Sequence, residues 1–164
     1  MPPRDPQWSP PSARERKELI DGSHTVAIVG ASNNPARPSY FVATYLLSSS
    51  TDFEVYFVNP REREILGRPA YPTLADVPVT PDIVDVFRRS EDLPGVAEEA
   101  IDKGAKVFWA QLGLRNDVAA QLAYDAGLAA VMDRCLKIEH ARFHGGLHLA
   151  GFDTGVISSR RAAR

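Results

Sequence analysis

Small, hydroxyl and basic side chains follow the first strongly apolar run of the chain. The run TVAIV at residues 25–29 ends in Gly30, Ala31 and Ser32, and Arg37 lies shortly after them. Small residues let the backbone approach a phosphate closely, while Ser32 adds a hydroxyl donor and Arg37 a positive charge. The loop therefore predicts a phosphate site, and the alternative is a tight turn that binds nothing.

The residues after the second apolar run help to distinguish NAD, NADP and coenzyme A (CoA) as candidate ligands. The loop holds only Gly30, so the three-glycine pattern of ordinary dinucleotide sites is missing. The run FEVYFV at 53–58 ends in Asn59 and Pro60, where an NAD site would have Asp or Glu. Arg61 and Arg63 come next and could meet a further phosphate, either the 2′-phosphate of NADP or the 3′-phosphate of CoA. The alternative is a solvated surface pair.

Two further apolar runs end in groups that suit a nucleotide and its extension. The third ends in Phe87 and Arg88, an aromatic ring and a guanidinium that could contact adenine and pyrophosphate. The fourth ends in Gln111 and Gly113, with Asn116 close behind. Uncharged amides suit the peptide-like arm of pantetheine better than they suit hydride chemistry.

The elements that must position these residues alternate between strand and helix. Apolar periodicity and stop signals predict strands at 25–30, 53–58, 83–87, 107–112 and 128–132, and helices at 12–20, 39–48, 91–103 and 116–126. Ser12 with Glu15 forms a capping-box pattern, and Asn116 is an N-cap residue. The pattern predicts an α/β, Rossmann-like fold with a five-stranded, mainly parallel sheet and helices on both faces.

Three segments follow from this pattern. Residues 1–24 form a proline-rich arm and a short helix, residues 25–142 form the Rossmann-like domain, and residues 143–164 form an extension expected to pack on the body or on a second subunit. Residues 61–81 contain several prolines and are expected to be an irregular crossover. In an open sheet of this kind the ligand lies at the carboxyl ends of the strands.

Bulk properties exclude several function classes. The chain has 164 residues and a formal net charge of −2, which offers no electrostatic basis for binding nucleic acid or an anionic membrane. No apolar run approaches the roughly 18 residues of a membrane-spanning helix. The single cysteine, Cys135, fits a reducing cytoplasm. We therefore expect a cytoplasmic protein without nucleic-acid or membrane partners.

Several segments together resemble the CoA-binding domain family, in particular its small stand-alone bacterial members related to the nucleotide-binding domain of the succinyl-CoA synthetase α subunit. The matching segments are VAIVGASNNPARPSY, YFVNP, LGRPAYPTLADVP, IVDVFRRSE, EEAIDKGAKVFWAQLG and AGLAAVMDRCLKIEH, spread over roughly residues 25–140. The resemblance implies a Rossmann-like fold that binds CoA. Carried over to this chain, it implies a binding site formed by Gly30, Ala31, Ser32, Arg37, Ser39, Asn59, Pro60, Phe87, Arg88, Gln111, Gly113 and Asn116.

No convincing catalytic constellation accompanies this site. Arg134 and Lys137 flank Cys135 in sequence and could favour a thiolate able to form a mixed disulfide with CoA, but a small packed cysteine is the favoured interpretation. His140, His144 and His148 recur every four residues, and surface histidines are favoured over a metal site. Asp82, Asp85 and Asp133 form no evident acid–base pair. We expect neither catalytic residues nor metal ligands.

The resulting prediction is a non-catalytic protein that binds CoA or acyl-CoA as a sensor, carrier or regulator. Succinyl-CoA ligase activity is not implied, because the chain is too short for the separate domain with the phosphorylated histidine. Two alternatives stay open: an NADP-binding, oxidoreductase-like protein, and a protein-interaction module with a vestigial pocket. A small-molecule CoA ligand is the expected partner, and a homodimer is a further prediction.

Overall fold

The computed structural model describes residues 4–144, which form one sheet between two layers of helices. The elements are α1 (Ala13–Asp21), β1 (Thr25–Val29), α2 (Pro38–Leu46), β2 (Glu54–Val58), β3 (Glu64–Ile65), β4 (Arg68–Tyr71), η1 (Leu74–Asp76), β5 (Ile83–Val86), η2 (Ser90–Asp92), α3 (Leu93–Lys103), β6 (Val107–Ala110), α4 (Asp117–Asp125), β7 (Ala129–Val131) and α5 (Leu136–Phe143). The predicted capping box of Ser12 and Glu15 and the Asn116 cap are both confirmed.

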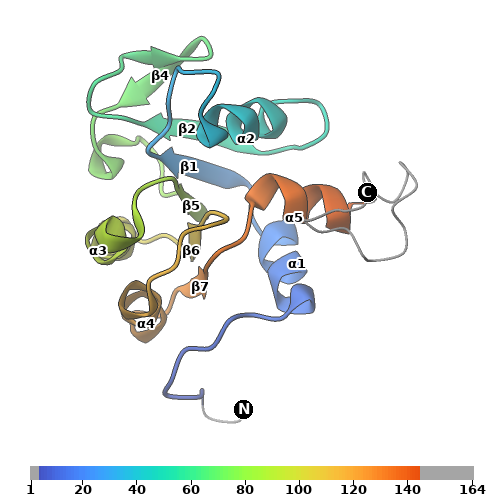
Figure 1. Ribbon diagram of the computed structural model, residues 1–164, viewed down its shortest axis with the longest axis vertical. Helices are drawn as coiled ribbons and strands as arrows, with labels where there is room; N and C mark the ends of the chain where they lie inside the picture. The colour runs from blue at the N-terminus through green and yellow to red at the C-terminus, as the bar shows by residue number, and fades with distance from the viewer. Residues whose placement is uncertain (1–3, 145–164) are drawn as a thin grey trace.

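The sheet has the order β3-β4-β2-β1-β5-β6-β7 (Figure 1). Parallel pairing joins β1 to both β2 and β5, and continues from β5 through β6 to β7. The chain adds strands on one side of β1 and then on the other, so strand order reverses between β1 and β5. Such a reversal leaves a crevice at the carboxyl ends of the strands, where open α/β sheets bind ligands. The predicted Rossmann-like fold is therefore confirmed.

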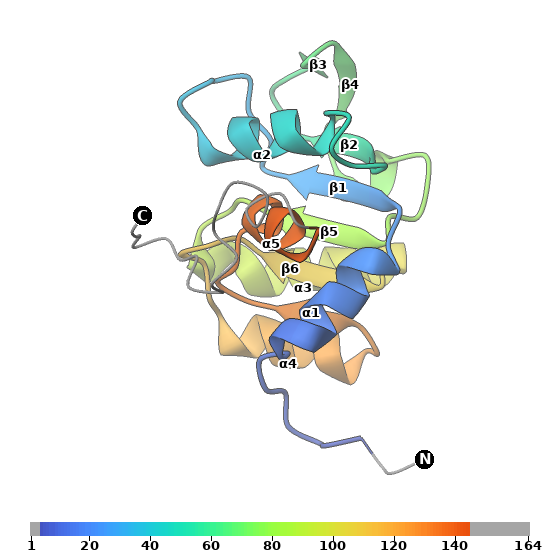
Figure 2. The ribbon, with the colours of Figure 1, turned by 90° about the vertical axis from the view of Figure 1, so that its right-hand side faces the viewer.

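Helices cover both faces of the sheet, as predicted. Helices α3 and α4 lie on one face of the sheet, and α1, α2 and α5 lie on the other (Figures 1 and 2). The apolar residues of each group pack against the strands on its own side. Strands β5 and β6 are buried along their whole length, because parallel strands covered on both faces exclude water from both sides. The carboxyl ends of these central strands are thus held by a rigid scaffold.

The segment at 61–81 contains more regular structure than its sequence predicts. Strands β3 and β4 form a hairpin whose two-residue turn, Leu66 and Gly67, has positive φ angles of 50° and 76°. A turn of this conformation matches the twist of paired strands, and glycine adopts it without strain. Strand β4 also pairs in parallel with β2. The sheet therefore has seven strands where five were expected.

The proline-rich N-terminal arm lies against β7 and α4. The Trp8 indole is buried and donates through Nε1 to the carbonyl of Ala130 at 2.9 Å, while its backbone N–H donates to Gln121 Oε1 at 2.9 Å. Arg4 donates to the carbonyl of Leu128 at 3.3 Å, and its guanidinium lies 3.6 Å from the ring centroid of Tyr124. The arm therefore follows the body of the domain from residue 4 onward.

Helix α5 was not expected from the sequence, and it lies beside α1 (Figure 2). The Arg16 guanidinium on α1 and the Glu139 carboxylate on α5 form a buried ion pair, with side chains 7% and 3% exposed. The first turn of α5 lies at the carboxyl ends of the strands and forms one wall of the crevice. The ion pair therefore also stabilises the position of this wall. The predicted packing of residues 143–164 falls almost entirely outside the described residues.

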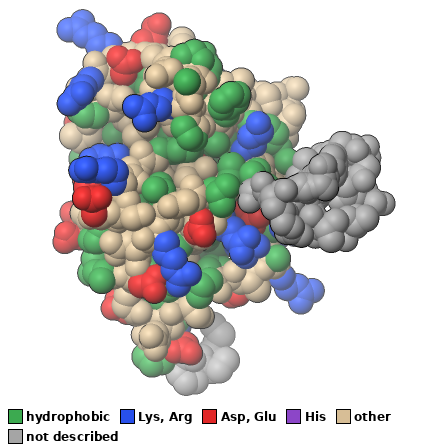
Figure 3. Space-filling model, viewed as in Figure 1, with side chains coloured by type: hydrophobic (Ala, Val, Ile, Leu, Met, Phe, Trp, Pro, Cys, Tyr) green, Lys and Arg blue, Asp and Glu red, His purple; other side chains and the backbone are tan. Residues whose placement is uncertain are grey.

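The surface carries both signs of charge. Figure 3 shows basic and acidic side chains interspersed over the face viewed, in keeping with the net charge of −2. Several form exposed ion pairs, including Arg89 with Asp92 at 3.3 Å and Arg115 with Asp117 at 2.8 Å. Among residues 4–144, no helix has the length and apolar character needed to cross a bilayer.

Candidate functional site

The turn after β1 approaches β5 so closely that only glycine fits. Gly30 has a φ of +87°, and a Cβ atom at this position would lie 2.5 Å from the carbonyl oxygen of Phe87. Both the positive φ and the close approach exclude larger residues. The neighbouring Ala31 is buried. One glycine at this position is therefore sufficient to bring the turn against the strand, without the further glycines of a dinucleotide-binding loop.

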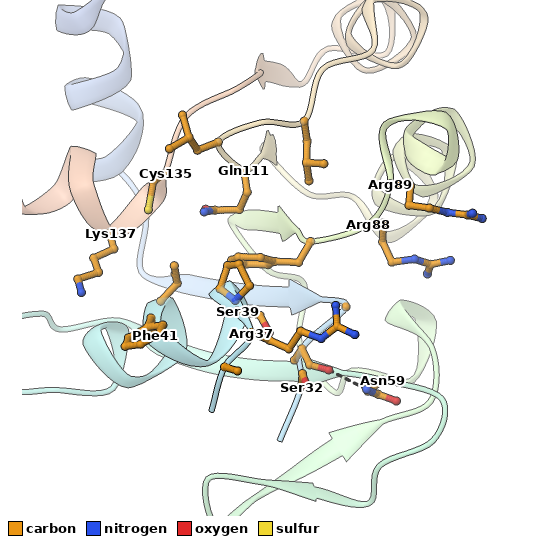
Figure 4. A pocket seen from close by; sticks show the side chains of 18 of the residues that line it. Ser32, Arg37, Ser39, Phe41, Asn59, Arg88, Arg89, Gln111, Cys135 and Lys137 are labelled. Atoms are coloured by element: carbon orange, nitrogen blue, oxygen red, sulfur yellow. Dashed lines mark hydrogen bonds between the residues drawn. The ribbon is translucent and has the colours of Figure 1, made fainter. Parts of the chain in front are cut away.

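A cavity of about 940 Å³ opens at this edge of the sheet, between α2 and the first turn of α5 (Figure 4). Its size is at the upper end of the range for small-molecule sites, about 300–1,000 Å³. The strand order reverses directly beneath it. It is lined by Gly30, Ala31, Ser32, Ala36, Arg37, Pro38, Ser39, Phe41, Val42, Asn59, Arg61, Phe87, Arg88, Arg89, Gln111, Leu112, Leu114, Cys135, Lys137 and Ile138.

The charged side chains that line this cavity are all basic. Four arginines and Lys137 contribute to its wall, and no carboxylate of the described residues does. Arg37 precedes the first residue of α2 and has no ion-pair or hydrogen-bond partner for its side chain within residues 4–144. Arg88 lies 3.9 Å from Asp92, a distance at which the pair is weak. The cavity is therefore suited to a ligand with several negative charges.

Nine of the twelve predicted site residues lie together at the cavity: Gly30, Ala31, Ser32, Arg37, Ser39, Asn59, Phe87, Arg88 and Gln111. The structure does not bring the other three to its wall. Pro60 is exposed beyond the end of β2. The Gly113 N–H donates to Asp133 at 2.6 Å, and the Asn116 side chain caps α4 and donates to the carbonyl of Ser90 at 3.0 Å.

Asn59 holds the loop that follows β1 in place. Its amide donates to the carbonyl of Ala31 at 2.7 Å, and its Oδ1 accepts from the N–H of Arg61 at 2.7 Å. Ser32 Oγ accepts the N–H of Asn34 at 3.0 Å and keeps its own proton available as a donor. Asn59 thus stabilises the loop from β2, in addition to lining the cavity. The Ser32 hydroxyl and Arg37 remain free to meet a phosphate.

Two polar side chains near the centre of the cavity differ in their bonding. Gln111 is buried, and its Oε1 accepts the N–H of Leu136 at 3.0 Å, which fixes the start of α5. Ser39 is 3% exposed, and its hydroxyl has no hydrogen-bond partner within the described residues. A buried hydroxyl without a partner is rare and needs an explanation. A hydrogen bond to a ligand in the cavity would explain it.

Asp85 lies beneath this site, two residues before Phe87. It is fully buried, with neighbours Ile28 and Trp109 on the adjacent strands. Neither carboxylate oxygen has a partner within the described residues, and burial raises the pKa of this carboxyl well above 3.8. Asp82 and Asp133 instead accept backbone N–H groups. The three aspartates thus lie in different surroundings, Asp85 without a partner among the described residues and the other two bonded to backbone.

Several residues of the cavity were not predicted as site residues. Helix α5 brings Cys135, Lys137 and Ile138, and no periodic pattern in the sequence pointed to this helix. Phe41 and Leu112, with 60% and 48% of their surface exposed, are further wall residues. Phe41 lies in the first turn of α2, and an aromatic residue so soon after the loop that holds Ser32 and Arg37 is the sequence signal that could have identified it.

The prediction of surface histidines is wrong for His140. This residue is 6% exposed, bonds Tyr45 through Nδ1 at 2.8 Å and stacks on His144 at 4.1 Å between ring centroids. His144 in turn contacts Asp21 at 3.0 Å. No metal-binding cluster occurs within residues 4–144, and His148 lies outside them. The contacts of His140 and His144 with Tyr45 and Asp21 join α1, α2 and α5 on the face of the sheet that these three helices cover.

Protonation of His140 is expected to destabilise the fold. Burial lowers its pKa below 6.5, and the neighbouring His144 lowers it further. The unfolded chain then binds a proton more readily than the folded chain, so stability present above pH 6.5 is lost as the pH falls below it. Urea unfolding at pH 7.5 and 5.5 should show a smaller loss for His140→Gln than for the wild type. His24→Gln, at an exposed position, is the control, and equal losses in all three proteins would contradict the prediction.

Comparisons with known proteins identify relatives across most of the chain. A family model described as a CoA binding domain matches residues 24–141. The uncharacterized protein YneT of Bacillus subtilis is 44% identical over 131 residues, covering 80% of this chain and 96% of YneT. A hypothetical protein of known structure from Pyrococcus horikoshii is 37% identical with a TM-score of 0.76, covering 84% of this chain and 97% of that one.

One relative with a named activity matches a smaller part. Acetate–CoA ligase [ADP-forming] II of Archaeoglobus fulgidus is 29% identical over 82 residues, which is 50% of this chain and 12% of the ligase. The chain therefore corresponds to a small portion of that enzyme.

Proposed function

The chain belongs to the CoA binding domain family, and from that premise we propose that it binds CoA or acyl-CoA in the cavity at the carboxyl ends of β1, β5 and β6. The observation that carries the proposal is the cavity wall, with five basic side chains and no carboxylate from the described residues. CoA combines a diphosphate and a 3′-phosphate with a long arm of low charge. A basic, partly apolar cavity of about 940 Å³ matches this combination.

The chemistry of the wall suggests an orientation for the ligand. The diphosphate would lie at the loop, where Ser32, Arg37 and the start of α2 are available. The adenine and 3′-phosphate would lie toward Arg61 and Arg88, which follow β2 and β5, the strands on either side of β1. The pantetheine arm would extend past Ser39 and Gln111, whose hydroxyl and amide match its peptide groups. Figure 4 shows Arg88 and Arg89 on one side of Ser39 and Gln111, and Cys135 and Lys137 on the other.

We propose a binding role, as a sensor, carrier or regulator, and not a ligase reaction. The site offers polar groups for holding a ligand, and its lining among the described residues includes neither a carboxylate nor a histidine to act as a general acid or base. A cytoplasmic location, where CoA and a reduced cysteine would be found together, belongs to this proposal.

Calorimetric titration with CoA, dephospho-CoA, NAD and NADP tests the proposal directly. Micromolar affinity for CoA, weaker affinity for dephospho-CoA and no binding of NAD would support it. Tighter binding of NADP than of CoA would favour the oxidoreductase-like alternative. Binding of none of the four would overturn the proposal and favour a protein-interaction module.

Arg37→Ala should weaken CoA binding about tenfold or more. A hydrogen bond to a charged group contributes roughly 1.5–3 kcal/mol. The Arg37 side chain has no hydrogen-bond or ion-pair partner within residues 4–144, so its removal breaks no contact of the folded chain that could itself change CoA affinity. The control is Arg14→Ala, which removes an exposed arginine of α1 that does not line the cavity. Equal CoA affinities for these two variants would contradict the placement of the diphosphate.

A further inference from the structure

Cys135 lies at the end of the cavity away from the phosphate loop. It is the single cysteine of the chain, it is partly exposed, and it is the N-cap residue that directly precedes α5. One side of it packs against the core, and it also lines the cavity next to Lys137. Figure 4 shows Cys135 and Lys137 on the opposite side of Ser39 and Gln111 from Arg88 and Arg89. The reactive end of CoA is likewise separated from its phosphates by the pantetheine arm.

The unpartnered hydroxyl of Ser39 is a second, independent indication that a ligand occupies the space between these ends. This side chain is 3% exposed, and its Oγ has no hydrogen-bond partner among the described residues although it lines the same cavity. An amide of the pantetheine arm would satisfy it. A ligand that contacts both the phosphate loop and Ser39 has its far end directed toward the first turn of α5.

We propose that Cys135 takes up CoA as a mixed disulfide, by thiol–disulfide exchange with a CoA disulfide bound in the cavity. This inference rests on the proposed CoA site. The Cys135 thiol releases its proton to solvent, and Sγ attacks the CoA sulfur of the bound disulfide. The Sγ–S bond forms as the original S–S bond breaks, and the other half leaves as a thiolate that takes a proton from solvent. One disulfide replaces another, so no external oxidant is needed, and a small thiol in excess reverses the step.

The charge of the cavity suits this exchange. Negative charge is spread over the attacking, central and leaving sulfur atoms as the bonds change. Lys137 lies two residues from Cys135 on the same wall, and no carboxylate of the described residues lines the cavity. The charged side chains of the wall are all basic, and a positively charged wall favours a transition state that carries negative charge. The bound nucleotide would supply the remaining acceleration by holding the disulfide near Sγ.

The geometry favours disulfide exchange over transfer of an acyl group from acyl-CoA to Cys135. Acyl transfer passes through a tetrahedral oxyanion, which needs hydrogen-bond donors beside the nucleophile. The backbone N–H that follows Cys135, that of Leu136, already donates to Gln111 Oε1 at 3.0 Å. Attack on a disulfide sulfur creates no oxyanion and requires no such donor.

The test is intact-protein mass spectrometry of the full chain after incubation with CoA disulfide, with pantethine, which lacks the nucleotide, and with glutathione disulfide. We expect one CoA adduct per chain, which dithiothreitol removes. This adduct should form at least about tenfold faster than the pantethine and glutathione adducts, because binding of the nucleotide holds the disulfide close to Sγ. Cys135→Ser should form no adduct. Ser39→Ala should slow CoA-adduct formation about 2–10-fold, as the loss of one hydrogen bond implies.

The outcomes separate this inference from the proposed function. Normal CoA affinity in the titration, with no adduct or with equal rates for all three disulfides, would overturn the inference and leave the CoA site standing. Failure to bind CoA would overturn both. An adduct with the mass of an acetyl group after incubation with acetyl-CoA, and no CoA adduct after incubation with CoA disulfide, would replace exchange by acyl transfer.

Discussion

Asp85→Asn is expected to raise the free energy of unfolding at pH 7 and to leave it nearly unchanged at pH 4. The wild-type carboxyl is fully buried without a partner among the described residues, and burial raises its pKa well above 3.8. The folded chain therefore keeps a proton that the unfolded chain releases. Stability that is fully present below pH 3.8 is lost as the pH rises toward the folded-state pKa. Each unit of difference between the two pKa values is worth about 1.4 kcal/mol, so the gain at pH 7 should be at least about that large.

Urea unfolding at pH 4, 5.5 and 7 measures this difference. Asparagine has nearly the same shape as aspartic acid, carries an NH2 group in place of the hydroxyl and cannot ionise, so its advantage in the free energy of unfolding should grow with pH. Asp102→Asn, at an exposed position on α3, is the matched control and should show no such trend. An advantage that is the same at pH 4 and pH 7, or a variant less stable than the wild type at pH 7, would show that Asp85 is not held protonated.

Arg16→Met should lower the free energy of unfolding by about 3–5 kcal/mol, the usual loss when one partner of a buried ion pair is removed. Methionine replaces most of the aliphatic volume of arginine but leaves the Glu139 carboxylate, which is 3% exposed, without its main partner. Arg142 lies 3.7 Å from the other oxygen of Glu139 and compensates only in part. A loss of this size is a large share of the stability of a small domain.

Two further variants isolate the charge from the packing. Arg16→Met combined with Glu139→Gln removes the uncompensated carboxylate, so much of the lost stability should return. Arg14→Met changes an exposed arginine of the same helix and should have little effect. If Arg14→Met and Arg16→Met had similar melting temperatures, or if the double variant were no more stable than Arg16→Met, the buried pair would not be what joins α1 to α5.

The central strands and their helices follow directly from local sequence, which explains why the fold could be predicted. Strand β6 is wholly apolar, β1 is apolar after Thr25, and β5 is apolar apart from Asp85, as is typical of parallel strands covered on both faces. The caps at Ser12 and Asn116 are local hydrogen-bonding patterns and are equally visible in sequence. The β3–β4 hairpin was missed because its strands are very short and β4 contains proline, which is unusual in strands.

The part of the site that was predicted belongs to these same local units. The phosphate loop and the ends of β2, β5 and β6 could be placed because the carboxyl ends of parallel strands meet at one edge. Helix α5 depends instead on contacts between distant segments, namely Arg16 with Glu139 and Tyr45 with His140. Its apolar periodicity is weak, so Cys135, Lys137 and Ile138 could not be assigned to the cavity from sequence.

The N-terminal arm covers the outer edge of the sheet at β7. The Ala129 N–H bonds to β6, so the carbonyls of Leu128 and Ala130 face the opposite, open side of β7. Arg4 and Trp8 donate to these two carbonyls. An exposed edge strand with unpaired carbonyls is a template for pairing with another chain, and natural proteins cover such edges to prevent aggregation. The arm occupies that edge with side-chain donors from a proline-rich segment poorly suited to strand pairing, and so protects the domain from edge-to-edge self-association.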